Sequence, residues 1–273
     1  SWGMTDFTQR VTFQRALEGE LARTIATLRG IERAAVHLVL PPPSPLRRLE
    51  EPAGASVVLT LKSGATLSAE TVQGIISARM DRLEENLKRI MQVASVIGRE
   101  FAFRILQAIS GMREELKVQL LNLQGLEFIY EKRLFPELEY IFKHALIQEV
   151  AYNSLLLKRR KEIHERIGKA IEELYLERLE EFYEMLAYHY ARGEGLEKAS
   201  QYLKLSGSKA ARNHSLWEAH SFYKEALATL NQLPETVENK KEKLEVLVLM
   251  ITPMSLSGYP EGSLGILQDG ESL

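Results

Sequence analysis

Histidine has the widest chemical range of the residue types in this chain, because it can act as a base, a proton carrier or a metal ligand near neutral pH. The histidines are His37, His144, His164, His189, His214 and His220. No two of them have the H-E-x-x-H spacing that places two imidazoles on one helical face. His214 and His220 are six residues apart and fall on different faces. We therefore expect no metal site and no catalytic histidine.

Other catalytic signatures are also absent from the sequence. The chain has no cysteine, which excludes disulfides, thiolate metal sites and a cysteine nucleophile. It contains no G-x-S-x-G segment, which would present a serine nucleophile, and no G-x-x-x-x-G-K-[S/T] loop, which would hold a phosphate. We expect a protein that is not an enzyme, with no catalytic residues, no cofactor and no metal.

The composition fits an ordinary soluble protein of two or three domains. The 273 residues are 45% hydrophobic and 26% charged, and the net charge of −2 gives no argument for nucleic-acid binding. No apolar run reaches the roughly 18 residues of a membrane span, and no signal peptide is visible. The chain begins Ser-Trp-Gly and its last segment resembles an incomplete repeat, so we interpret it as a fragment truncated at its C-terminus.

Residues 1–74 predict a small α+β unit. The first helix is expected from the N-cap pair Thr5-Asp6 to about Leu28, with an apolar stripe that includes Phe13, Leu17 and Leu21. Strands are expected over 34–40 and 56–61, and a second helix from about 69, capped by Ser68 or Thr66. In this order two helices cover one sheet face. The polar face of the first helix supplies candidate interface residues, which are Arg15, Glu18, Glu20 and Arg23.

The amino-acid sequence of this unit resembles the second ring-building motif of the flagellar M-ring protein family. The resemblance is carried by residues 2–9, 14–25, 35–43 and 55–61, and it continues to about Gln73. It implies homo-oligomerisation into a ring at the bacterial inner membrane, within the flagellar basal body. The family's transmembrane helices, and the strand that should follow the second helix, are not found in this chain.

Residues 75–143 predict a winged-helix-like unit. Short helices are expected over 86–96, 101–109 and 113–123, followed by a hairpin with strands at 126–130 and 139–142. Winged helices often bind DNA through the third helix. Here that helix opens with Glu114 and Glu115, and Lys117 is its one cation after Arg113, so packing against a neighbouring domain is favoured over DNA.

Residues 144–273 predict helices that repeat in the manner of a tetratricopeptide array. Leu196–Tyr202 and Leu216–Phe222 align at a spacing of 20, and each places a small residue, Ala199 or Ala219, one turn before an aromatic residue. Such arrays present a groove to protein partners. Tyr202, Trp217 and Phe222 are the candidate contact residues. The preceding segment, Phe142 to Leu156, is expected to be a joint whose aromatic and leucine side chains lie in the core.

From about Val72 onward the chain resembles the region that follows the nucleotide-binding domain in bacterial signal-transduction ATPases, which are often fused to class III adenylate or guanylate cyclases. The resemblance is carried by Arg79–Leu83, Gln92–Phe101 and Phe142–Tyr152. It implies a winged-helix regulatory module followed by tetratricopeptide-like repeats. Because the two resemblances meet inside one expected helix, near Val72–Ile76, we interpret the chain as chimeric.

Together these observations predict a mainly α protein with a small α+β N-terminal unit, in three domains. They are a partial ring-building motif (1–74), a winged-helix-like unit (75–143) and tetratricopeptide-like helices (144–273). The expected function is non-enzymatic protein–protein assembly, with oligomerisation through residues 1–74. The alternatives are a regulatory segment of a nucleotide-dependent ATPase or cyclase and, third, DNA binding. We expect residues 75–273 to be cytoplasmic in a bacterium and residues 1–74 to act at the inner membrane.

Overall fold

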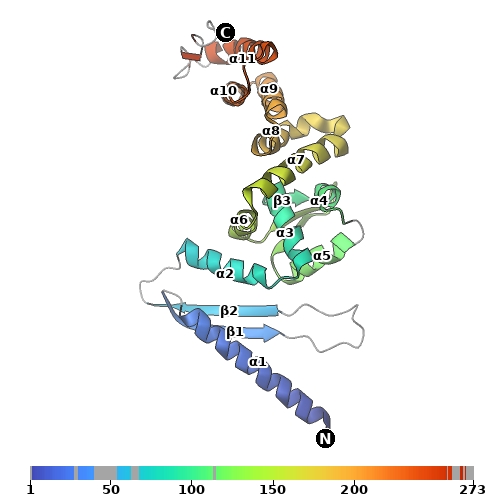
Figure 1. Ribbon diagram of the computed structural model, residues 1–273, viewed down its shortest axis with the longest axis vertical. Coiled ribbons are helices and arrows are strands. Elements are labelled where there is room, and N and C mark those ends of the chain that lie inside the picture. Colours follow the sequence, from blue (N-terminus) through green and yellow to red (C-terminus); the bar gives the residue numbers. More distant parts are fainter. Residues whose placement is uncertain are drawn as a thin grey trace. The chain divides into compact units, whose positions relative to one another are not determined.

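A computed structural model describes residues 2–27, 30–39, 54–62, 68–112, 115–256, 258–259, 265, 266 and 268 (Figure 1). Most of these residues are helical. Residues 40–53, which include the end of the strand expected over 34–40, and residues 269–273 lie outside the described residues.

The chain divides into two compact units. Unit 1 comprises residues 1–95 and 112–153, and unit 2 comprises residues 96–111 and 154–273. The elements of unit 1 are α1 (Trp2–Ala26), β1 (Ile31–Val39), β2 (Gly54–Leu61), α2 (Ala69–Asp81), α3 (Glu85–Ile97, which crosses into unit 2 after Ser95), α5 (Glu115–Gly125), β4 (Ile129–Arg133), β5 (Glu139–Phe142) and α6 (Ala145–Asn153). Those of unit 2 are β3 (Glu100–Ala102), α4 (Phe103–Ser110), α7 (Leu157–Leu174), the 3-10 helix η1 (Leu176–Phe182), α8 (Tyr183–Arg192), α9 (Leu196–Arg212), α10 (Leu216–Leu230) and α11 (Val237–Leu256).

The N-terminal part of unit 1 is a helix laid against a two-stranded antiparallel ribbon. β1 and β2 pair in register, with Val36 opposite Val57, and α1 packs against β1 (Figure 1). Among the described side chains of these elements, Ile31 and Val36 are buried. Leu17 and Leu21 are half-buried, and Phe13 is 62% exposed, so the prediction that Phe13 faces a core is wrong. A ribbon of two strands about 5 Å apart is too narrow to cover the apolar stripe of so long a helix.

α2 begins where the sequence predicted it. Ser68 is its N-cap, and the Ser68 hydroxyl accepts a hydrogen bond from the Thr71 backbone N–H at 3.2 Å. The helix then runs without interruption across the predicted boundary at residues 74 and 75. Its main packing partner is α6. The expectation that both helices of the first unit cover one sheet face is therefore wrong for α2. This helix, whose buried residues are Ile76 and Met80, packs mainly against α6.

The rest of unit 1 is built from α3, α5, α6 and the β4–β5 hairpin. The predicted apolar face of α3 is buried at Leu87, Ile90 and Met91. On α5, Leu116, Leu120 and Leu123 are buried, but Leu121 is 64% exposed. One residue corresponds to about 100° of rotation on a helix, so Leu121 lies away from the stripe that Leu120 belongs to.

The hairpin is present, but its first strand is shifted. β4 begins at Ile129 instead of Leu126, because the chain turns after α5 and Glu127 adopts a φ of 58°. Ile129 pairs with Phe142. Similarly, the helix predicted from Phe101 starts at Phe103, after the short strand β3. Within the expected joint, Phe142 is buried as predicted, Leu146 and Tyr152 are half-buried, and Leu156 is exposed, contrary to the prediction.

In unit 2 the helices from α7 to α11 pack in chain order, each against the next. Small residues sit where they cross. Ala199 and Ala219 are buried, as the repeat pattern predicted. The aromatic residue that α10 buries is Tyr223, one residue after the predicted Phe222, which is half-buried. The last long helix, α11, continues through the buried Pro253 to Leu256.

Candidate interaction surfaces and the Glu172 cluster

The predicted interface residues of α1 divide into two groups. Arg15, Glu20 and Arg23 are exposed, and the Arg23 guanidinium donates to the Gly19 carbonyl of its own helix at 3.1 Å. Glu18 points the other way. Its carboxylate accepts a hydrogen bond from the Leu38 backbone N–H at 2.8 Å, which ties α1 to β1.

Gln14, which the sequence analysis did not single out, completes this tie. Its amide donates to the Leu38 carbonyl and, at 3.4 Å, to the Glu18 carboxylate. Both polar groups of the Leu38 peptide are therefore satisfied by α1. The spacing of four residues between Gln14 and Glu18 indicates pairing within the helix. It does not indicate their contact with Leu38, which lies 20 residues after Glu18 in the chain.

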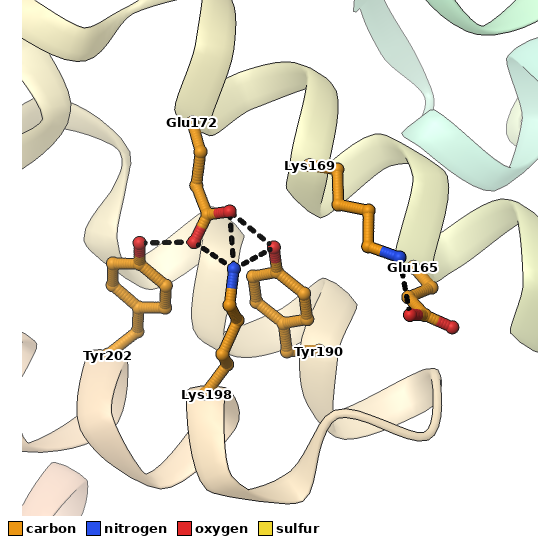
Figure 2. Close-up of polar contacts among 6 residues, drawn as sticks. All are labelled: Glu165, Lys169, Glu172, Tyr190, Lys198 and Tyr202. Atoms are coloured by element: carbon orange, nitrogen blue, oxygen red, sulfur yellow. Dashed lines mark hydrogen bonds and ion pairs between the residues drawn. The ribbon is translucent and has the colours of Figure 1, made fainter.

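The most connected polar cluster of the described residues joins α7, α8 and α9 (Figure 2). Its centre is Glu172 on α7. The Tyr202 hydroxyl donates to Glu172 Oε1 at 2.6 Å, and the Tyr190 hydroxyl donates to Oε2 at 2.8 Å. The Lys198 ammonium lies 2.8 and 2.6 Å from the two carboxylate oxygens. We call these four residues the Glu172 cluster.

The electrostatics of the Glu172 cluster favour a fixed ion pair. Burial acts to raise the pKa of Glu172, but the hydrogen bonds from Lys198, Tyr202 and Tyr190 outweigh it, so the pKa lies below its usual value. Burial, and then hydrogen bonding to Glu172, raises the pKa of both Tyr190 and Tyr202. Neither the Glu172 carboxyl group nor the two tyrosine hydroxyls are poised to exchange a proton near neutral pH, which argues for a structural role.

Packing around Tyr190 explains why glycines occur here. A Cβ atom on Gly168 would lie 2.7 Å from the Tyr190 ring, and one on Gly195 would lie 2.8 Å from it. The same ring stacks parallel to Tyr202, with centroids 5.9 Å apart. These glycines let the ring approach two backbones closely, and so place its hydroxyl on Glu172.

The aromatic candidates of the repeats are found in different environments. Tyr202 is buried and belongs to the Glu172 cluster. Phe222 is half-buried. Trp217 is 68% exposed on α10, where its ring stacks on His220 at a centroid distance of 6.1 Å. Of the three, Trp217 offers the most surface to a partner.

Within the described ranges no group of three or more histidine, aspartate or glutamate side chains could hold a metal ion. The structure does bring together His164 and His189, two of the histidines that the spacing did not connect. They are 25 residues apart on different helices, so no local pattern indicated their contact.

Comparison with known proteins gives one family match. Residues 1–93 match the family described as "Secretory protein of YscJ/FliF RBM domain". The flagellar M-ring protein of Aquifex aeolicus is 33% identical over 167 residues, covering 59% of this chain and 33% of the relative. That of Salmonella typhimurium is 43% identical over 75 residues, covering 28% and 13%. The chain thus spans a third or less of the length of these relatives.

Two solved structures are also similar. The 58–213 fragment of FliF is 49% identical and covers 29% of this chain and 50% of that chain, with a TM-score of 0.25. A Signal Transduction ATPase with Numerous Domains with a tetratricopeptide repeat sensor, from Pyrococcus horikoshii, is 13% identical and covers 77% and 46%, also with a TM-score of 0.25. These TM-scores are too low to assign a fold to this chain.

Proposed function

We propose that this protein is a non-enzymatic assembly protein that associates with other copies of the chain through residues 1–74. The match of residues 1–93 to a family that includes flagellar M-ring proteins supports ring-type assembly. By the same similarity, the site of action would be the bacterial flagellar basal body. The helices of the described residues include none that is long and apolar enough to cross a membrane.

The observation that carries the proposal is the incomplete burial of α1, β1 and β2. Leu17, Leu21 and Ile25 are half-buried, and Phe13 and Val58 are 62% and 59% exposed. An isolated two-stranded ribbon is marginal in water, and stability requires more strands or further apolar cover. A second copy can supply that cover, because every copy presents the same uncovered surface.

The polar contacts prepare this surface for association. Gln14 and Glu18 fix α1 on β1 through the Leu38 peptide. The apolar side chains of α1 are thereby held in place before another copy arrives, which lowers the entropy cost of binding. Arg15, Glu20 and Arg23 stay exposed beside them and are proposed to set the register between subunits.

We infer a second role, protein binding, for the tetratricopeptide-like helices proposed for residues 144–273. Consecutive helices that pack in chain order form an extended surface on which partners dock. The exposed Trp217 is the anchor that such a partner would use, since tryptophan is enriched among residues that dominate interface energies. In this reading residues 75–143 form the winged-helix-like unit, and α5 serves packing or partner contacts.

Two other functions have less support. A nucleotide-responsive role would need an ATPase supplied by another part of the protein or by a partner, since this sequence has no phosphate-binding loop. DNA binding would need positive charge on α5, but the described residues of that helix include Glu115 and Lys117 and expose Val118 and Leu121. Both observations favour a protein partner.

Light scattering after size exclusion tests the assembly proposal. The wild-type chain is expected to form oligomers that grow with concentration. Phe13→Ser should weaken association about tenfold or more, because burying a phenylalanine contributes about 1.5–3 kcal/mol. The matched control is Leu176→Ser, which removes an exposed apolar side chain from η1 in unit 2 and should leave association unchanged. A wild-type chain that stays monomeric at high concentration would refute the proposal.

A further inference from the structure

Two buried imidazoles meet between α7 and α8. His164 and His189 are 1% and 0% exposed, and their Nδ1 atoms lie 2.8 Å apart. The ring centroids are 5.1 Å apart with the planes tilted by 44°. This is a direct contact between two titratable side chains in the interior of unit 2.

The contact cannot survive protonation of both Nδ1 atoms. A hydrogen bond between two Nδ1 atoms needs a proton on one nitrogen and a lone pair on the other. Protonating the acceptor ring places an N–H against an N–H, which removes the bond and leaves a charge in its place. His189 Nε2 is also buried and has no hydrogen-bond partner among the described residues, so that end of the ring offers an added proton no acceptor.

The charged groups that act most strongly on the pair do not compensate an imidazolium. Of the charged groups on the same two helices, Arg160 and Arg192 act on the pair, and both are cations. The Arg192 guanidinium stacks on Tyr188, whose ring meets both imidazoles edge-on. Burial, and then these cations, lowers the pKa of His164 to about 4. Burial, and then His164 and Arg192, lowers that of His189 to about 3.

Several carboxylates of the neighbouring elements already have partners. Glu165 of α7 holds Lys169, and Glu194, after α8, lies near Lys161. Glu184 of α8 and Glu180 of η1 are bound by two cations of α9, Lys209 and Arg212. Between α7 and α4, the Arg166 guanidinium of α7 donates a hydrogen bond to the Ile109 carbonyl of α4. Each of these acids would have to leave an existing partner to stabilise a charged histidine.

We propose that the His164–His189 pair is an acid-sensitive joint, at which α7 and α8 separate when the pH falls. In the open state each imidazole reaches water and regains an ordinary pKa near 6.5. Above that pH both states are neutral and the joint is fully closed. Below that pH the open state binds protons and the closed state does not, so the fraction of closed joints falls as the pH falls toward the low folded-state pKa values.

The size of the effect follows from the number of protons. Each proton bound on opening shifts the equilibrium about tenfold per pH unit. If both rings are protonated in the open state, opening should increase by about a hundredfold per pH unit between about pH 6 and pH 4. A joint that bound no protons would show no such slope.

Hydrogen–deuterium exchange of the whole chain, corrected for the intrinsic effect of pH, measures the joint directly. The amides of residues 157–192 should lose protection as the pH falls from 7 to 5, and those of α3 in unit 1 should change far less. The double variant His164→Gln/His189→Gln should flatten this pH dependence. The control is His214→Asn, which removes a histidine that follows α9 at a φ of 60° and should keep the wild-type slope.

Two outcomes would overturn the proposal. One is a wild-type chain in which residues 157–192 and α3 lose protection in parallel, a comparison that stands even if the double variant does not fold. The other is a folded double variant that keeps the full pH dependence, which would place the titrating group elsewhere.

Discussion

At the scale of single residues, Glu172 illustrates how a side chain becomes structural. Its carboxylate receives hydrogen bonds from Tyr190, Tyr202 and Lys198, which come from α8, α9 and the first turn of α9. An acid with this many donors is stabilised as the anion. Each of the four residues is an ordinary surface type in the sequence, so no residue type pointed to the cluster.

Replacing the carboxylate should cost measurable stability. Glu172→Gln removes the charge that Lys198 pairs with and turns one acceptor into a donor facing a hydroxyl, so we expect a loss of about 2 kcal/mol in urea unfolding at pH 7. Glu165→Gln, which breaks only the exposed pair with Lys169, should cost less than about 0.5 kcal/mol. Equal losses in the two variants would argue against a structural role for the cluster.

The same variant carries a pH signature. Because the folded-state pKa of Glu172 lies below its ordinary value, its stabilising contribution is present above the unfolded-state pKa and is lost as the pH falls through the folded one. The stability difference between wild type and Glu172→Gln should therefore be full at pH 7 and shrink under acid conditions.

At the scale of elements, close helix crossings depend on glycine. Gly207 on α9 faces Tyr223 on α10, and an added Cβ would lie 2.5 Å from the ring. Tyr223 is almost fully buried, and its hydroxyl lies 3.1 Å from the Ser208 hydroxyl. The Tyr223 ring therefore has little freedom to move aside, and α9 and α10 can approach this closely because Gly207 has no side chain.

Two glycine-to-alanine variants separate packing from helix propensity. Gly207→Ala should destabilise unit 2 by about 1–3 kcal/mol because it overpacks the crossing. Gly74→Ala, in α2, meets no atom within 4 Å and should stabilise its helix by about 0.5–1 kcal/mol. Thermal unfolding of both variants measures the difference, and a stabilising effect of Gly207→Ala would contradict the close approach.

At the scale of the whole molecule, α2 connects the first segment of the chain, which matches a family model, to a second segment beyond residue 93. It matches the ring-building family within residues 1–93, yet it packs on α6 from the second segment. The Arg79 guanidinium lies 4.7 Å from the centroid of the Phe128 ring and donates to the Leu126 carbonyl at 3.0 Å. The domain boundary at residue 74 stays a prediction, although no break in the helix marks it.

Arg79→Ala tests whether these contacts hold α2 in unit 1. Losing the cation–π contact and the hydrogen bond should cost about 1–2 kcal/mol and raise deuterium exchange in α2 and residues 126–133 together. Arg82→Ala, at the C-cap of the same helix, is the control and should leave exchange in 126–133 unchanged. Unchanged exchange in Arg79→Ala would mean that apolar burial of Ile76 and Met80 alone secures the helix.

Much of the secondary structure could be predicted from the sequence. The face of α3, with Leu87, Ile90 and Met91, follows from apolar residues three or four apart, and the N-cap Ser68 was one of two candidates that residue type and position indicated. The hairpin was predicted, but its start was misplaced because the positive φ of Glu127 has no signature in a non-glycine residue.

What the sequence alone determined is the approximate position of most helices and strands and the absence of a catalytic motif, because backbone periodicity and motif spacing are local properties of the chain. The tertiary structure decided which surfaces remain uncovered and which distant polar groups meet. Phe13 is exposed because its partner sheet is narrow. The buried Tyr202 donates a hydrogen bond to Glu172, and His164 contacts His189 across a helix crossing. Those outcomes depend on distances between elements, which spacing along the chain does not encode.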